Sequence, residues 1–181
     1  YDDLIAGTSS GAFAYTEAPN TSPVLSVPDA VTVEATGSAG IATSDEAIIN
    51  FLSEATATDS EDGDLTSDIT NDLGDYADVG NNNVVFSVTD SDGATVSTSV
   101  TLTVADTIAP NLTVPNNLTV TAISDEGISS SASALSTFFE GASATDAVDE
   151  NPSISNDAPG SLPVGSTVVT FTATDFAGNT S

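Results

Sequence analysis

An internal repeat is the feature that most constrains how this chain can fold. Three segments recur along it: Pro23–Pro28 as Pro110–Pro115, Phe51–Asp59 as Phe138–Asp146, and Val84–Asp90 as Val169–Asp175. The first two pairs share an offset of 87 positions and the third has an offset of 85. A constant offset with one short deletion is the mark of two homologous units. We therefore predict domain 1 over residues 22–105 and domain 2 over residues 107–181, preceded by an N-terminal extension, residues 1–19.

Each unit has the pattern of β-strands, because apolar and polar residues alternate with period two between clusters of Ser, Thr, Asp, Gly and Pro. The alternating segments are Val31–Val33, Val84–Val88, Val100–Val104, Leu118–Val120 and Val169–Ala173. Ala47–Ser53 fits a short helix by pattern, but its place between two strand signals favours a strand. We predict an all-β fold of two tandem immunoglobulin-like β-sandwich domains.

The chain of 181 residues has 27 Asp and Glu and no Lys, Arg or His, so its formal net charge is −27. Without His or Cys it has no imidazole or thiolate metal site, no disulfide and no His-activated nucleophile. Without Lys or Arg it lacks the groups that bind nucleic acid and anionic lipid. The remaining carboxylates, hydroxyls, amides and carbonyls are ligands for a hard cation, above all calcium. Such a charge suits a cation-rich medium, so we expect an extracellular or cell-surface location.

Several function classes are disfavoured. The acids lie in turns, and no Trp or Arg is present to hold a sugar, so we expect no enzymatic activity. A carbohydrate-binding module is an alternative, but its aromatic platform would need Tyr1, Tyr15, Tyr76 and a few Phe. No stretch reaches the roughly 18 apolar residues of a membrane helix, so we expect no direct membrane insertion. The chain does not begin with Met, and we expect a mature or internal piece of a protein.

Three motifs carry a family resemblance: Ala57–Thr66, Val104–Pro110 and Val169–Asn179. They resemble the tandem bacterial immunoglobulin-like and hyalin-repeat (HYR) modules and, more distantly, cadherin-like repeats. The resemblance covers roughly residues 22–181. It implies an all-β fold and an extracellular setting, in which such modules serve as stalks, adhesins and filament subunits. It does not choose among these functions.

The frame of the repeat predicts that domain 2 lacks its last strand. Ser181 maps to Val96, so domain 2 has no counterpart of residues 97–104. Two neighbouring strands would then expose an unpaired edge, which is a template for strand addition. The segment Gly11–Glu17 precedes domain 1 as that last strand precedes domain 2. At the offset of 87, Phe13 falls on Val100 and Tyr15 on Leu102.

Two hypotheses follow from this frame. In the first, residues of about 4–16 in one subunit fill the gap in domain 2 of the next, through Ala12, Phe13, Ala14 and Tyr15. This donor-strand complementation joins copies of the chain head-to-tail into a filament, and its contacts extend to matrix or other cells. In the second, the chain is a segment of a covalent stalk in a large calcium-dependent surface adhesin. A disordered N-terminal tail is a third possibility, but it leaves domain 2 incomplete.

The carboxylates gather in loops that an immunoglobulin-like sandwich brings to one end of each domain. In domain 1 the candidate ligands are Glu17, Asp59, Asp62, Asp64, Asp90 and Asp92. In domain 2 they are Asp106, Asp146, Asp149, Glu150, Asp175 and Asn179. Four or more carboxylates at one end repel unless a cation lies among them, and calcium accepts six to eight oxygens. The competing interpretation is that these acids only stabilise turns.

Four N-x-Ser/Thr sequons occur, and they are candidate glycosylation sites if the source glycosylates its surface proteins. They begin at Asn20, Asn111, Asn117 and Asn179. Chance in a chain this rich in Ser, Thr and Asn accounts for most of them.

Overall fold

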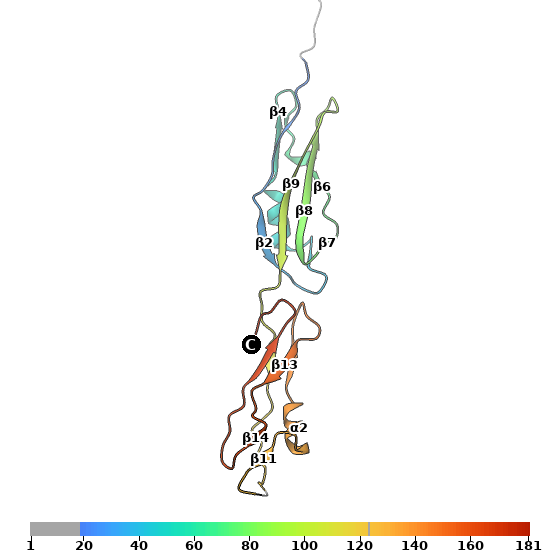
Figure 1. Cartoon of the computed structure of the whole chain (residues 1–181). Helices are drawn as coiled ribbons and strands as arrows, with labels where there is room; N and C mark the ends of the chain where they lie inside the picture. The colour runs from blue at the N-terminus through green and yellow to red at the C-terminus, as the bar shows by residue number, and fades with distance from the viewer. Residues whose placement is uncertain (1–18, 123) are drawn as a thin grey trace, which may run out of the picture.

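The computed structural model describes residues 19–122 and 124–181 (Figure 1). Strands dominate it, and the predicted all-β fold is confirmed. Every described sheet is built from strands of residues 22–105 alone or of residues 107–181 alone. The two units lie end to end, and the linker after residue 105 joins them (Figure 1).

The main sheet of domain 1 has four strands in the order β2-β9-β8-β6. They are β2 (Val31–Glu34), β9 (Thr95–Ala105), β8 (Gly80–Thr89) and β6 (Thr70–Asn71). The pair β8–β9 is antiparallel over ten residues, whereas β2 pairs with β9 in parallel. The predicted alternation holds here, since Val84, Phe86 and Val88 are buried on one face of β8.

Short strands make the second layer of domain 1. β1 (Val24–Ser26), β4 (Thr56–Asp59) and β5 (Gly63–Asp64) form one sheet, and β3 (Ile41–Ala42) pairs with β7 (Tyr76–Ala77). A 3₁₀ turn, η1 (Thr66–Asp68), follows β5. The core between the layers includes Ile41, Phe86 and Leu102, all at most 2% exposed.

The prediction of a strand at Ala47–Ser53 was wrong, because this segment is the helix α1 (Glu46–Ser53). The Asp45 side chain caps it by accepting the Ala47 N–H at 3.0 Å. Ile48 and Phe51 are both buried. Residues three apart share one face of a helix but lie on opposite faces of a strand, so only the helix buries both. Phe51 then packs edge-on against Phe86 of β8, with ring centroids 6.1 Å apart.

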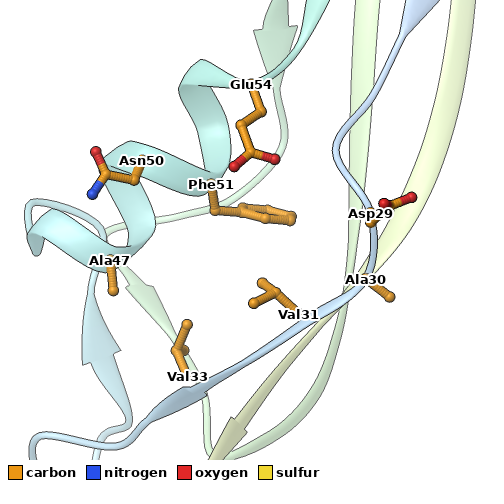
Figure 2. Close-up of a pocket in the computed structure, with 8 residues that line it drawn as sticks. All are labelled: Asp29, Ala30, Val31, Val33, Ala47, Asn50, Phe51 and Glu54. Carbon is orange, nitrogen blue, oxygen red and sulfur yellow. The ribbon is translucent and has the colours of Figure 1, made fainter.

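A groove lies between α1 and β2. Figure 2 shows Phe51 of α1 across from Val31 and Val33 of β2, with Asp29 and Glu54 at the rim. Its floor is apolar, and its two carboxylates come from different elements rather than one cluster. The groove therefore lacks the convergent polar groups that a catalytic or metal site needs.

Domain 2 repeats this arrangement in reduced form. The helix α2 (Ser133–Phe139) corresponds to α1. The ring centroids of Phe138 and Phe171 lie 5.9 Å apart, and this pair corresponds to Phe51 and Phe86 in domain 1. The described residues of domain 2 form three antiparallel strand pairs: β10 (Asn111–Thr113) with β12 (Ser143–Thr145), β11 (Ile128–Ser129) with β14 (Ser161–Leu162), and β13 (Ser153–Asn156) with β15 (Phe171–Thr174). Among its described residues, the buried apolar ones are few: Leu135, Phe171 and Ala173.

The prediction of a strand at Leu118–Val120 was also wrong, and β15 begins only at Phe171 rather than at Val169. Both departures have one cause. Within the described part of domain 1, β2 is an edge strand whose one partner is β9, and β9 also pairs with β8 over residues 95–104. Residues 118–121 correspond to β2, and no described residue stands where β9 would. A segment without a hydrogen-bonding neighbour does not form a strand.

Candidate metal site at the joint and open sheet of domain 2

Three carboxylates meet at the joint between the domains. Asp106 lies in the linker just after β9, Asp146 just after β12, and Asp175 just after β15. One oxygen from each lies within 4.8 Å of the other two. Asp175 is buried, and the other two are half-buried. The sequence placed these three residues in one predicted cluster, and the structure brings them together.

Backbone hydrogen bonds hold two of these carboxylates in place. Asp146 Oδ1 accepts the N–H groups of Val148 at 2.8 Å and Asp149 at 2.9 Å. Asp175 Oδ1 accepts the Asn179 N–H at 2.8 Å. The Asn179 amide donates to Asp175 Oδ2 at 2.9 Å and to the Asp106 carbonyl at 3.1 Å. The turn role of these acids is therefore real, and it orients them toward one point.

The electrostatics of the joint favour a cation. Burial raises the pKa of Asp106, and the charges of Asp146, Asp175 and Glu34 raise it further. For Asp175, burial alone would raise the pKa, but hydrogen bonds from the Asn179 side chain and from nearby backbone N–H groups outweigh it and lower the pKa. Asp175 therefore stays charged while Asp106 is repelled by its neighbours. A bound cation would remove that repulsion.

Further contacts fix the linker between the domains. Glu34, at the end of β2, accepts the Thr107 N–H at 2.9 Å and the Thr107 hydroxyl at 2.6 Å. Val148 of domain 2 packs against the core of domain 1. Sequence reasoning missed Glu34, because nothing in the alternation of β2 shows that its last side chain reaches the linker.

Two more predicted ligands lie at the joint but outside the three-oxygen group. Asp149 and Glu150 line a groove beside Asp106, together with Val79 of domain 1 and Phe176 of domain 2. Asp149 Oδ1 accepts the Asn151 N–H at 2.9 Å, so it stabilises its own turn. These two residues are therefore placed to add outer charge rather than to join the group.

The candidate ligands of domain 1 are more dispersed. Among the described residues, no three acids of this domain gather as Asp106, Asp146 and Asp175 do. Asp62 accepts the Ser91 N–H and hydroxyl, both at 2.8 Å, and Asp64 accepts the Thr66 N–H at 3.0 Å. Hydrogen bonds from Thr66 lower the pKa of Asp64. Asp92 is exposed, and Glu17 lies outside the described residues.

Two acids of domain 1 are buried. Asp59 and Asp90 correspond to Asp146 and Asp175, and they are 8% and 6% exposed. Asp90 accepts the Asn20 side-chain amide at 3.1 Å and the Ala94 N–H at 2.7 Å. Burial alone would raise the pKa of Asp90, but these bonds outweigh it and lower that pKa. Domain 1 thus keeps two of the three positions of the joint, but position 19, which corresponds to Asp106, is Pro.

The second functional feature is the open edge of β15. Ala173 exchanges two backbone hydrogen bonds with Ser181, at 3.0 and 3.1 Å, as Val88 pairs with Val96 in domain 1. On the side of the strand that corresponds to the β9 side of β8, no described residue pairs with residues 165–171. Val84 of domain 1 is 1% exposed beneath β9, whereas its counterpart Val169 is only half-buried. The predicted assembly residues Ala12, Phe13, Ala14 and Tyr15 lie outside the described residues.

The sequons differ in their surroundings. Asn111 and Asn117 are exposed. Asn20 is exposed too, but its amide bonds to Asp90, and Asn179 is engaged at the joint. A glycan on Asn179 would displace its contacts with Asp106 and Asp175, so that sequon is the least suited of the four.

These features define an all-β chain built from a tandem repeat, with carboxylates at the joint between units. Among the described residues, neither helix is long and apolar enough to cross a membrane. Residues 105–181 match the family model of the HYR domain. The chain therefore contains a hyalin-repeat (HYR) module, and the resemblance predicted from its motifs is confirmed.

Two relatives extend the likeness to domain 1. Hyalin of Lytechinus variegatus is 33% identical over 177 residues, which cover 96% of this chain and 32% of that protein. Hyalin of Strongylocentrotus purpuratus is 34% identical over 133 residues, 71% of this chain and 11% of that protein. The chain thus spans about a third of the first relative and about a tenth of the second.

A solved structure shows a looser likeness. The structure of CBM51-2 in complex with GlcNAc and INT domains from Clostridium perfringens ZmpB is 25% identical, with a TM-score of 0.34. The match covers 53% of this chain and 21% of that one. A likeness at this TM-score carries nothing over to the function of this chain.

Proposed function

We propose that this chain is a non-enzymatic structural module of an extracellular fibre at the cell surface, and that a strand from outside the described residues completes domain 2. The open edge at residues 165–171 carries this proposal, because β9 fills the same position in domain 1. The match to hyalin and a charge of −27 without a single base support an extracellular, cation-rich setting. The engagement of the acids in turns supports the absence of catalysis.

Domain 1 gives the geometry of the missing strand. Leu102 of β9 lies between Asn82 of β8 and Val31 of β2, and Val104 lies between Gly80 and Val33. Leu102 and Val104 are 0% and 1% exposed.

The corresponding places in domain 2 lie between Thr167 and Leu118 and between Gly165 and Val120. Gly80 and Gly165 share a positive φ, of 108° and 124°, so the chain enters the edge in the same way in both domains. The acceptor therefore takes a strand with apolar residues two apart, antiparallel to residues 165–171 and parallel to residues 118–121.

The direction of this strand gives a linear assembly. β9 runs the length of domain 1 toward the joint (Figure 1). A strand in the same place in domain 2 would run to the far tip, where the next unit would begin. Supplied by residues 4–16 of another copy, through Phe13 and Tyr15, the strand links copies head-to-tail.

A covalent stalk is the second candidate, and the length of the relatives favours it. The first hyalin is about three times as long as its matched region, since the chain covers 32% of it. In that case the completing strand belongs to the same polypeptide, and the chain is a segment of a large surface adhesin.

Electron microscopy of the whole chain beside a version lacking residues 1–19 tests the assembly. We expect filaments from the whole chain and none from the truncated one. Changing Phe13 and Tyr15 together to Asp should also abolish filaments, whereas Tyr1→Asp, an aromatic-to-acid change in the same extension, should not. Monomers from all four proteins would contradict donor-strand assembly and favour the covalent stalk.

We also propose that calcium binds among Asp106, Asp146 and Asp175 and stiffens the joint. Support comes from the three converging oxygens and from the raised pKa of Asp106, which burial raises most and the charges of Asp146, Asp175 and Glu34 raise further. Calcium is the suitable ion because it accepts carboxylate and carbonyl oxygens in flexible geometry. Thermal unfolding in calcium and in chelator tests this, and equal melting temperatures in both would contradict it.

A further inference from the structure

The Asp59 carboxylate has one oxygen that the described part of the chain leaves without a partner. Oδ1 accepts the N–H groups of Glu61 at 2.8 Å and Asp62 at 3.1 Å. Oδ2 is fully buried and has no hydrogen-bond partner among the described residues. The side chain as a whole is 8% exposed. A buried carboxylate oxygen without a donor is costly, and a ligand at this point would remove that cost.

A second carboxylate, that of Glu61, lies beside Asp59. The Glu61 carboxyl lies within hydrogen-bonding reach of the Asp59 carboxyl. Its Oε2 accepts the hydroxyls of Thr21 at 2.6 Å and Ser60 at 2.7 Å. Two acceptors in contact require either a shared proton or a cation between them.

The comparison with the joint favours a cation. Asp59 corresponds to Asp146, and both accept the N–H groups two and three residues ahead. The linker carboxylate Asp106 has no counterpart here, since position 19 is Pro. Glu61 corresponds to Val148, which is apolar and packs on domain 1. Domain 1 thus lacks the acid from the linker and gains one from its own loop.

We infer that Asp59 and Glu61 bind a divalent cation, calcium by their ligand chemistry, at the outer end of domain 1. The ion contacts the buried Asp59 Oδ2 and the Glu61 carboxylate. The site uses residues of domain 1 and is separate from the joint, so it depends neither on the joint site nor on strand exchange. In a head-to-tail fibre, this end of domain 1 abuts the far tip of domain 2 in the next unit.

Calcium binding to the full 181-residue chain tests the inference, with stoichiometry measured by equilibrium dialysis. We expect Asp59→Asn to lose one calcium per chain, because the amide keeps the Oδ1 bonds but places a donor at Oδ2. Glu61→Gln should lose the same ion, and since Glu61 is exposed this variant is expected to fold. The control is Asp68→Asn, which removes an equal charge from an exposed position of the same domain, in η1; it should keep the ion.

Each outcome decides the matter. Loss of one ion from both Asp59→Asn and Glu61→Gln, but not from Asp68→Asn, supports the site. Unchanged stoichiometry in Glu61→Gln overturns it, and so does an equal loss in all three variants. A shared proton would leave calcium binding unchanged and alter only the dependence of stability on acid pH, which also overturns the site. Asp146→Asn reports on the joint separately, so failure there leaves this result intact.

Discussion

Replacing Asp106 by Asn should have opposite effects on stability in chelator and in calcium. The three carboxylates of the joint approach within 4.8 Å, and two unit charges at that separation repel by about 1 kcal/mol when fully screened by water. Less complete screening raises this to about 3.5 kcal/mol. Because Asp106 is only half-buried and so still reaches water, which screens its charge, we use the lower of these two repulsion energies. The substitution removes two of the three repulsive pairs, so it should stabilise the calcium-free protein by about 2 kcal/mol.

In calcium the sign should reverse. An ion bound only by the folded protein stabilises it by about 2.7 kcal/mol at one hundred times its dissociation constant. The wild-type chain should gain this amount, and the variant, which has lost a ligand, should gain little. A melting-temperature difference of about 4–8 °C per kcal/mol is expected for a domain of this size, so both effects are measurable by calorimetry.

The control is Asp29→Asn, which removes an equal charge at the exposed rim of the groove in Figure 2. It should shift melting equally in calcium and in chelator. Two results would refute the reasoning: an Asp106→Asn variant that melts below the wild type in chelator, or one that gains as much from calcium as the wild type does.

Two further predictions follow from the sheet and from the acids. Appending a copy of residues 97–104 after Ser181 should complete domain 2 within one chain and bury counterparts of Leu102 and Val104, each of which contributes about 1.5–3 kcal/mol. We expect a higher melting temperature and no filaments. An extension with both apolar positions changed to Asp should neither raise the melting temperature nor abolish the filaments. Asp90 and Asp175 have a pKa below the ordinary 3.8, so the stability they contribute is present above that value and is lost as the pH falls through their lower folded pKa. Asp106 has the opposite sign, since its raised pKa makes its contribution complete below 3.8 and lost as the pH rises through the folded pKa. Thermal unfolding between pH 2 and 6 without calcium checks both signs. Asp175→Asn should reduce the loss of stability at acid pH, and Asp106→Asn should reduce the loss of stability at higher pH.

The all-β fold and the joint cluster were predictable because they depend on repetition and on loop position. Asp106, Asp146 and Asp175 each follow a strand, and strand ends at one edge of a sandwich bring their loops together. The helix α1 was misassigned for a physical reason. Its neighbours in sequence are strands, but the three-residue spacing of Ile48 and Phe51 was the stronger local signal.

Other features could not be read from the sequence. Leu118–Val120 alternates as Val31–Val33 does, yet alternation does not show whether a pairing partner is present. The orphan oxygen of Asp59 depends on which of its two oxygens the backbone N–H groups occupy, and only coordinates show this. Glu61 stands two residues after Asp59 in a motif already singled out, so its spacing was the one available signal.

The absence of every basic side chain explains why so many acids here bond to the backbone. In most proteins a buried carboxylate is paired with Lys or Arg, but this chain has neither. The buried Asp59, Asp90 and Asp175 and the half-buried Asp146 instead accept N–H groups from the residues that follow them. This satisfies only part of their hydrogen-bonding capacity. The remaining charge must be balanced by ions from the solvent. General screening would act on all exposed acids alike, whereas bound calcium acts only where oxygens converge. Comparing sodium with calcium at equal ionic strength therefore separates the two, and only the converging sites should distinguish the ions.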